Sequence, residues 1–189
     1  MDGGTGTDTA SYATALIGVG VNLFGGVVGG GDSAGDSYVS VENVVGSGFS
    51  DGIIGDDGAN GLWGMVGNDY LSGGGGADTL KGGAGADTFN YETVSDSTAS
   101  ARDTISDFSH AEGDVIDLWG VDADGNAGNG DTAFTFLGGA AFTGAGHELR
   151  VVASGGAQIV LADVNGDMVA DMQIVVVSAT TLVASDFLL

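Results

Sequence analysis

Carboxylate and amide side chains recur at every ninth residue in the middle of the chain. From Gly46 to Asn90 the sequence divides without a gap into five nine-residue blocks: GSGFSDGII, GDDGANGLW, GMVGNDYLS, GGGGADTLK and GGAGADTFN. Oxygen donors suit Ca²⁺, which takes about six to eight oxygen ligands in flexible geometry, better than they suit transition metals. We therefore expect several calcium ions, held by the sixth residues of the blocks: Asp51, Asn60, Asp69, Asp78 and Asp87.

The other residues of each block indicate how these ligands are positioned. The first six residues are typical of a turn, because glycine tolerates positive φ and lets backbone carbonyls approach an ion. The last three are typical of a short strand, whose eighth residue is apolar in every block and is expected to point inward. Glycines of the turns are expected to add ligands to the carboxylates: Gly64, Gly73, Gly76, Gly82 and Gly85.

Two blocks make one coil of eighteen residues, so the sixth residues should stack in two columns. One column holds Asp51, Asp69 and Asp87, and the other holds Asn60 and Asp78. The last two blocks match GGxGxDxUx at every specified position, a pattern known from calcium-binding parallel β-helices. The sequence thus predicts a parallel β-roll in which ions lie between neighbouring turns.

Acidic residues after the last block extend the candidate site. Asp96 follows Asn90 in the same phase and is expected as the next member of the second column. Further candidates are Asp103 and Asp107 in DTISDF and Asp114 and Asp117 in GDVIDL, which either hold another ion or stay solvated in loops. We expect the strongest binding around Asp78 and Asp87, because their blocks contain the fullest sets of glycines.

The composition excludes several classes of protein. The 189 residues include 38 Gly and no Cys, so disulfides, thiolate metal sites and cysteine nucleophiles are ruled out. The 26 acidic residues against 3 basic ones give a formal net charge of -23. This charge repels nucleic acids and anionic membranes and makes the compact state costly unless cations bind. Cations are the expected partners.

Membrane insertion and a cleaved leader are not expected. The longest apolar stretches, such as Ile174 to Val177, are of strand length and fall short of the ~20 residues that cross a bilayer. Met1 runs into Asp2 and Gly3 with neither a basic nor an apolar signal region. We therefore expect a protein that is exported, if at all, by a route without an N-terminal signal.

Changes in composition divide the chain into three parts. Residues 1–45 contain one isolated repeat, GGTGTDTAS, and alternating apolar residues that are expected to form longer rungs capping the roll. Residues 46–99 form the calcium-binding β-roll of tandem nonapeptides. Residues 100–189 contain less glycine and more strand-like apolar runs, which indicate a separate β-sandwich-like unit. The predicted fold class is therefore all-β.

Three short motifs resemble chemical sites but lack the required context. Ser33 stands in GDSAG, yet a nucleophile elbow needs a strand before it and a helix after it. His147 and Glu148 begin an HExxH pattern whose second histidine is missing. The tract from Asp163 to Asp171 resembles an EF-hand loop but has Met168 in place of the turn glycine. An enzyme is therefore not expected.

The second half resembles the C-terminal domain of serralysin-type (peptidase M10) metalloproteases. The resemblance is carried, in order, by DTISDFSHAEGDVIDL, AFTFLGGAAFTGAGHELRV, LADVNGDMVADMQIVV and TTLVASDFLL, and with the nonapeptides it covers residues 46–189. DSYVSVENVVGSGFSD is similar to segments of large RTX (repeats-in-toxin) proteins. In the serralysin family this region is a calcium-filled β-roll joined to a β-sandwich-like end.

The resemblance implies a noncatalytic module that folds on meeting extracellular calcium. It also implies a bacterial, secreted location and a C-terminal signal read by type I (ABC transporter) secretion machinery. The parent protein is then a larger secreted protein such as a metalloprotease or another hydrolase. The alternative is a carbohydrate-binding or adhesive module, as in the repeat modules of alginate epimerases, with a polysaccharide as partner. The sequence gives this alternative weak support, because Trp63 and Trp119 lie in separate regions.

Overall fold

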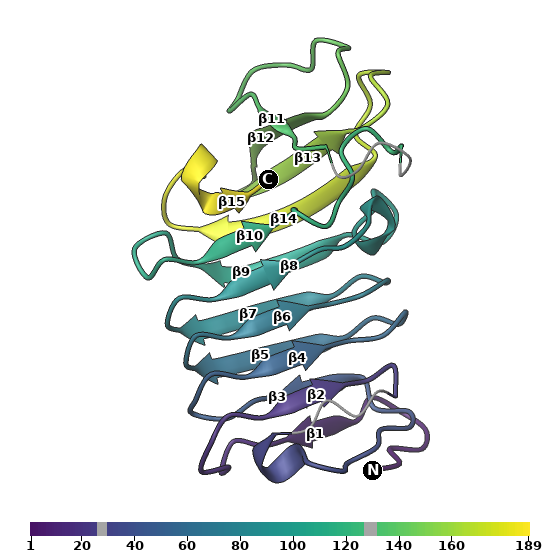
Figure 1. Ribbon diagram of the computed structural model, residues 1–189, viewed down its shortest axis with the longest axis vertical. Helices are drawn as coiled ribbons and strands as arrows, with labels where there is room; N and C mark the ends of the chain where they lie inside the picture. Colours follow the sequence, from purple (N-terminus) through teal and green to yellow (C-terminus); the bar gives the residue numbers. More distant parts are fainter. Residues whose placement is uncertain (26–29, 127–131) are drawn as a thin grey trace.

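The chain forms a β-roll in which short strands stack in two sheets. The computed structural model describes residues 1–25, 30–126 and 132–189. Successive coils climb from the N-terminus at one end of the molecule toward the C-terminal strands at the other (Figure 1). All strands of the repeat region pair in parallel, which confirms the predicted parallel roll.

The first sheet has six strands, in the order β15-β10-β8-β6-β4-β2. The strands are short because a turn follows each strand segment of the repeat. Their bounds are β2 Gly20–Asn22, β4 Gly52–Ile54, β6 Tyr70–Ser72, β8 Thr88–Asn90, β10 Val115–Asp117 and β15 Phe187–Leu188.

The second sheet has nine strands, in the order β1-β3-β5-β7-β9-β14-β13-β12-β11. Its pairs β12·β13 and β13·β14 are antiparallel, so the sheet changes from a roll to a meander at its C-terminal end. The bounds are β1 Thr9–Ser11, β3 Asn43–Val45, β5 Gly61–Val66, β7 Thr79–Ala84, β9 Asp103–Phe108, β11 Thr135–Phe136, β12 Glu148–Ser154, β13 Ala157–Asp163 and β14 Met172–Ser178.

Helical structure in the described parts consists of three short 3₁₀ turns: η1 Gly31–Ser33, η2 Val94–Asp96 and η3 Ala184–Asp186. No helix there is long or apolar enough to cross a membrane.

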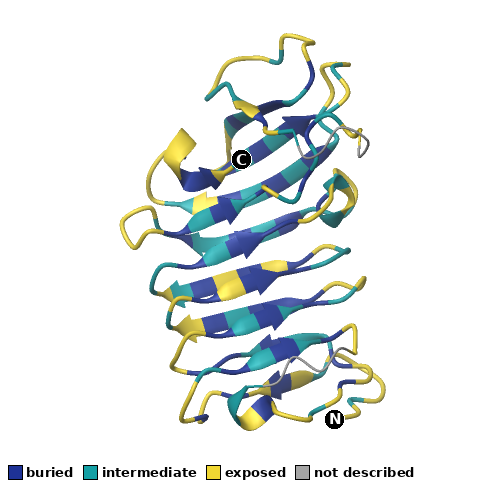
Figure 2. Cartoon of the chain, in the orientation of Figure 1, coloured by how far each residue is buried: buried dark blue, intermediate teal, exposed yellow. Residues whose placement is uncertain are grey.

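The core lies between the two sheets and contains the eighth residues of the repeats. Along each strand, buried side chains alternate with more exposed ones (Figure 2). The inward residues are at most 1% exposed in every coil: Ala10, Val21, Val44, Ile53, Leu62, Leu71, Leu80, Phe89, Ile105 and Ile116. Burial of this apolar ladder, at about 25 cal/mol per Å², holds the two sheets together and fixes the turns at their edges.

The two sheets run through the boundaries predicted after residues 45 and 99. β1 pairs with β3, with Thr9 opposite Asn43, so the isolated N-terminal repeat forms a coil of its own beneath the tandem repeats. At the other end, β9 pairs with both β7 and β14, and β10 pairs with β8. Because shared sheets do not define folding units, the division into three parts stays a prediction.

Candidate metal centre

The sixth residues of the repeats stack in two columns along the edges of the roll. In the first column, each backbone N–H donates to Oδ1 of the next aspartate, from Asp51 to Asp69 at 2.8 Å and from Asp69 to Asp87 at 2.9 Å. In the second column, the Asn60 N–H donates to Asp78 Oδ1 at 2.8 Å. Each step spans 18 residues, as the block length predicts.

Two aspartates outside the nonapeptides complete the columns. The Asp87 N–H donates to Asp114 Oδ1 at 3.0 Å, and the Asp78 N–H donates to Asp103 Oδ1 at 2.9 Å. The sequence pointed to acids in this region but did not place them in the columns. Both aspartates begin the aspartate-any-apolar pattern of the repeat, because Asp103 is followed by Thr104 and Ile105, and Asp114 by Val115 and Ile116.

Asp96 does not take the next hydrogen-bonded place in the second column, and its role as an ion ligand stays a prediction. The Asp96 carboxylate instead accepts the N–H groups of Glu92 and Thr93 at 2.8 and 3.0 Å, at the start of η2. Asp103 takes the place in the column, 25 residues after Asp78 rather than 18. The connection between β8 and β9 is longer than a repeat turn, so the 18-residue interval no longer predicts which residue enters the column there.

The isolated N-terminal repeat extends the second column toward the N-terminal end of the roll. The Asp8 N–H donates to Glu42 Oε2 at 2.8 Å, across 34 residues, and the Asn60 amide donates to the Glu42 carbonyl at 3.1 Å. A Cβ on Gly3 would stand 2.1 Å from the carbonyl oxygen of Ser40, so the turn is packed as closely as the tandem ones. The sequence treated this repeat as out of register, because nothing in it reveals the length of the first coil.

One carboxylate oxygen of most column aspartates is buried without a hydrogen bond. These atoms are the Oδ2 atoms of Asp69, Asp78, Asp87 and Asp103, whose residues are between 0 and 2% exposed. Tyr91 is fully buried, and its hydroxyl faces the carboxylate of Asp103. Its proximity to Asp103 raises the pKa of the phenol further above the value that burial alone gives. An unpartnered buried carboxylate is costly, so these oxygens are suited to hold a cation.

Burial dominates the electrostatics of the columns. It raises the pKa of Asp69 and of Asp78 to about 7 and that of Asp103 to about 8, although backbone N–H donors oppose the change. The pKa of Asp114 rises to about 6 and that of Asp87 also rises, again mainly through burial. The columns therefore contain carboxylates for which the protein supplies too little positive charge.

Glycine at the first position of each block lets these oxygens lie directly against its backbone. A Cβ would stand 2.2 Å from Asp69 Oδ2 on Gly64, 2.2 Å from Asp78 Oδ2 on Gly73 and 2.0 Å from Asp87 Oδ2 on Gly82. Gly64 also faces the carbonyl oxygen of Gly82, one coil away. The sequence-predicted ligands Gly64, Gly73 and Gly82 thus lie directly against the aspartates.

The fourth-position glycines have a different role in the turns. Gly76 and Gly85 have φ of 120° and 136°, and a Cβ would stand 2.4 Å from the Gly58 oxygen and 1.8 Å from the Gly67 oxygen. Met65 and Gly83 are the second residues of their blocks, and their φ angles are 86° and 105°. The turns therefore keep the same backbone even where glycine is replaced, at the cost of strain at Met65.

Asp51 and Asn60, the sixth residues of the first two blocks, already have hydrogen-bond partners within the protein. Asp51 Oδ1 accepts from the Val19 N–H and the Ser47 hydroxyl, each at 2.7 Å, and its Oδ2 accepts from the Ser47 N–H at 2.5 Å. Asn60 Oδ1 accepts from the Asp56 N–H at 2.8 Å. These two residues lie in the columns as predicted, but they do not present an unpartnered oxygen.

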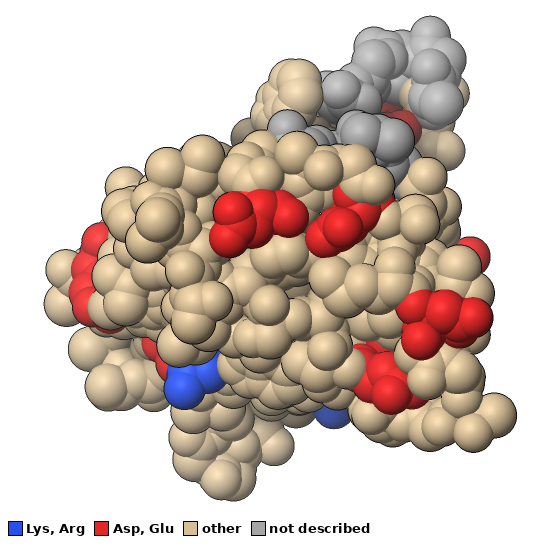
Figure 3. Space-filling view, turned by 90° about the horizontal axis from the view of Figure 1, so that it is seen from below, with Lys and Arg blue, Asp and Glu red and all other residues tan. Residues whose placement is uncertain are grey.

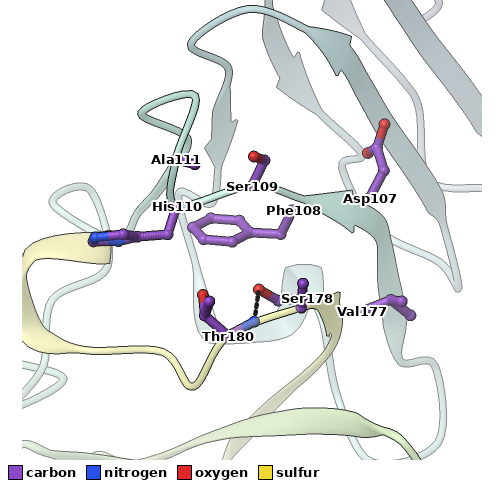
Figure 4. Close-up of a pocket in the computed structure, with 9 residues that line it drawn as sticks. Asp107, Phe108, Ser109, His110, Ala111, Val177, Ser178 and Thr180 are labelled. Atoms are coloured by element: carbon purple, nitrogen blue, oxygen red, sulfur yellow. Dashed lines mark hydrogen bonds between the residues drawn. The ribbon is translucent and has the colours of Figure 1, made fainter.

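Asp107 lies at the C-terminal end of the first column. Its two oxygens accept the N–H groups of Gly82 and Gly83 at 3.1 and 3.0 Å. It also borders a cavity of about 330 Å³ between the end of β9 and the end of β14. In Figure 4 its carboxylate points away from Phe108 and His110. Asp107 therefore holds the turn at Gly82 and Gly83, and its role as an ion ligand stays a prediction.

The three motifs set aside from the sequence lack the geometry of catalytic or ion sites. The Ser33 hydroxyl is buried 2.8 Å from the carbonyl oxygens of Gly20 and Gly30, one of which accepts its single proton. His147 occupies a turn with φ of 53°. Asp163 accepts the N–H groups of Gly166 and Met168 at 2.7 and 2.9 Å, so its loop is closed by protein donors.

No three His, Asp or Glu side chains converge on one point within the described ranges. A site in either column would instead combine one or two carboxylates with backbone carbonyls. Calcium accepts this donor set, because it takes carbonyl and carboxylate oxygens in flexible geometry. The residues present therefore fit calcium and not a transition metal.

The parallel coils and the two edge columns define a β-roll of the RTX type. A family model described as "Peptidase M10 serralysin C terminal" matches residues 11–189, and the chain belongs to this family. The match is to the C-terminal module of these peptidases and not to their catalytic domain. No protein with a curated description matches the chain.

Solved structures similar to this chain include two subunits of one enzyme. The AlgE6R2 subunit of the mannuronan C5-epimerase of Azotobacter vinelandii is 23% identical with a TM-score of 0.50, and the alignment covers 97% of this chain and 92% of that one. The AlgE6R3 subunit of the same enzyme is 24% identical with a TM-score of 0.42, over 76% of this chain and 80% of that one.

Proposed function

We propose that the chain is a noncatalytic module of a larger secreted bacterial protein, that it folds when it binds calcium, and that it carries a type I secretion signal. The observation that supports calcium most strongly is the set of buried, unpartnered Oδ2 atoms of Asp69, Asp78, Asp87 and Asp103. Each of the first three lies directly against the first-position glycine of its block, where a Cβ would clash with the carboxylate. Bound calcium would supply the positive charge that these carboxylates lack.

Folding without cations is opposed by two features of this chain. Its 38 glycines lose more backbone entropy on folding than other residues would, and its net charge of -23 makes the compact state repel itself. An ion bound only by the folded state adds about 2.7 kcal/mol of stability at 100 times its Kd. With several sites in the extracellular range of about 10⁻⁴ to 10⁻³ M, the chain stays open in a low-calcium cytosol and folds outside.

The C-terminal residues support a secretion signal that is read before folding. Asp186, Phe187, Leu188 and Leu189 form an acid followed by three apolar residues. In the folded protein Phe187 is buried, pairs with Ile116 in β10 and packs on Phe136 with ring centroids 5.3 Å apart. Asp186 is buried as well and contacts His110. A transporter can therefore read this tail only in the open chain.

Deletion of Phe187 to Leu189 separates the signal from the packing role. We expect secretion by cells with a cognate transporter to be lost, because the apolar part of the signal is gone. Calcium-dependent folding of the purified variant should persist with reduced stability, since burial of one Phe or Leu side chain contributes about 1.5 to 3 kcal/mol. Undiminished secretion would contradict the signal. Replacing Phe136, on which Phe187 packs, by Ala is the matched control for packing, because it leaves the tail unchanged.

A further inference from the structure

The second column contains an asparagine that is followed directly by glycine. Asparagine is a thermolabile residue, and it loses its side-chain amide fastest before glycine, which has no side chain to hinder its own backbone nitrogen. The sequence has three such pairs, at residues 60–61, 129–130 and 165–166, and the second of them lies outside the described residues. Of the two described pairs, the first lies in the column, where the Asn60 N–H donates to Asp78.

The reaction at such a pair requires only the chain and water. The Gly61 nitrogen bonds to the carbonyl carbon of the Asn60 side chain, the bond from that carbon to the amide nitrogen breaks, and ammonia leaves with the proton of the Gly61 N–H. Water then opens the resulting cyclic imide at either of its two carbonyl carbons. The product is aspartate, or isoaspartate in which the main chain runs through the side chain. The attack requires a free Gly61 N–H and a side chain that can turn toward it.

The folded roll removes both conditions at residue 60. Asn60 is 4% exposed, its Oδ1 accepts the Asp56 N–H at 2.8 Å, and its Nδ2 donates to the Glu42 carbonyl at 3.1 Å. Gly61 is the first residue of β5, and its N–H donates to Asn43 Oδ1 at 3.0 Å and to the Glu42 carbonyl at 3.2 Å. Because these bonds join β5 to the neighbouring β3, the pair is released only when the sheet opens.

The second described pair provides an internal comparison. Asn165 is exposed, and its Nδ2 donates to Asp171 Oδ1 at 3.1 Å. The Gly166 N–H donates to Asp163 Oδ1 at 2.7 Å. This pair lies in the loop between β13 and β14, which can open without separating the two strands. Reaction at Asn165 therefore depends less on folding than reaction at Asn60.

Loss of the Asn60 amide replaces a donor by a charge inside the column. The Nδ2 atom that would be lost faces the Glu42 carbonyl oxygen. In aspartate a carboxylate oxygen takes its place, so that two oxygens face each other and a buried charge lacks a partner. The chain has only 3 basic residues against 26 acids, and the view from below shows several acidic areas and little basic surface (Figure 3). The new charge therefore depends on a bound cation.

Isoaspartate has a larger effect than aspartate. It lengthens the main chain by one carbon atom, whereas each step of the column spans 18 residues and pairs the Asn60 N–H with Asp78 Oδ1 at 2.8 Å. A longer coil breaks this register, and with it the stacking of the coils above and below.

We infer that Asn60 is a deamidation site that is reactive while the chain is open and that calcium-driven folding closes. Reaction to aspartate gives a chain that binds one more calcium ion on folding. Reaction to isoaspartate gives a chain that no longer completes the roll, so the open chain keeps its capacity to fold for a limited time only. This inference rests on the proposed function, because it assigns the closing of the roll to calcium.

Peptide mapping by mass spectrometry tests the reactivity of the site. The full chain is incubated at neutral pH in chelator, in calcium or in urea, and aspartate and isoaspartate are measured at positions 60 and 165. Since opening is fast compared with this slow reaction, the rate at Asn60 should follow the open fraction, and fall about tenfold once circular dichroism shows a tenth of the chains open. The rate at Asn165 should fall less. In urea, Gly61→Ala should slow the reaction at Asn60 several-fold and leave Asn165 unchanged.

The variant Asn60→Asp tests the consequence for calcium binding. It reproduces the aspartate product, so the dependence of its free energy of unfolding on calcium should show one more ion released than in the wild type. Asn165→Asp adds the same charge in an exposed loop and is the matched control, with an unchanged number of ions.

Three results would overturn the inference: equal rates at Asn60 in the folded and the open chain, no product at position 60 in urea, or an unchanged number of ions in folded Asn60→Asp. A failure of the proposed function gives a different result. The chain would then have a β spectrum in chelator, and Asn60 would be protected in chelator as well as in calcium but would react in urea. That result would refute the role of calcium and leave the reactivity of Asn60 established.

Discussion

We expect Asp78→Asn and Asp87→Asn each to remove one calcium ion from the folding equilibrium, and Asp51→Asn to remove none. The reason is the difference in hydrogen bonding: Oδ2 of Asp78 and of Asp87 is buried without a partner, while both oxygens of Asp51 accept protein donors. Asparagine preserves the Oδ1 acceptor that the neighbouring coil uses. Asn60 already occupies the equivalent place in the second column.

The measurement is the free energy of unfolding as a function of calcium concentration. At a calcium concentration of 100 times the Kd, loss of one site should lower the free energy of unfolding by about 2.7 kcal/mol. The slope of this free energy against the logarithm of the calcium concentration gives the number of ions released on unfolding, and this number should fall by one. Asp51→Asn should cost about 1 to 3 kcal/mol through its hydrogen bonds, with an unchanged slope. Without calcium at neutral pH, Asp78→Asn should be more stable than the wild type, because a buried unpaired charge is gone. Equal slopes for all three variants would contradict this assignment.

Acid should fold the calcium-free chain. In the fold, burial raises the pKa of Asp69 and Asp78 to about 7 and that of Asp103 to about 8, from an ordinary value of 3.8. The folded state then binds protons more tightly than the unfolded state, so the contribution to stability is fully present below about pH 4. It is lost as the pH rises through about 7 to 8. Protons thus replace calcium at the same oxygens.

Calcium reverses this dependence, because its ligands must be deprotonated. Circular dichroism in calcium-depleted buffer should show more β structure near pH 4 than near pH 7.5. At a limiting calcium concentration, it should show more β structure near pH 7.5 than near pH 4. Asp78→Asn, which cannot titrate at that position, should reduce the pH dependence without calcium. A calcium-free chain that is less folded in acid than at neutral pH would refute the prediction.

The regular part of the fold follows from the spacing of residues in the sequence. The eighth residues, such as Leu62 and Leu71, are apolar at a fixed interval and are buried in the structure. The same interval places Asp69 above Asp51, because both the strand and the turn repeat without change. Local periodicity is enough here, since each coil packs on a nearly identical neighbour.

The irregular parts depend on lengths and contacts that the repeat does not specify. Asp96 was expected in the second column, but the longer connection before β9 gives that place to Asp103. Asp8 joins the same column through a coil of 34 residues. The protein donors that satisfy Asp51 come partly from Val19, far away in the sequence, so its weaker need for an ion is visible only in the fold.

Far-ultraviolet circular dichroism of the purified chain, with and without calcium, tests the central claim most directly. In excess chelator at neutral pH, the buried carboxylates have no counter-charge, and the chain should give the spectrum of an open coil. Addition of calcium in the millimolar range should convert it cooperatively to β structure, while magnesium at the same concentration should not, because it prefers rigid octahedral sites. A β spectrum that is the same in chelator and in calcium would contradict the account.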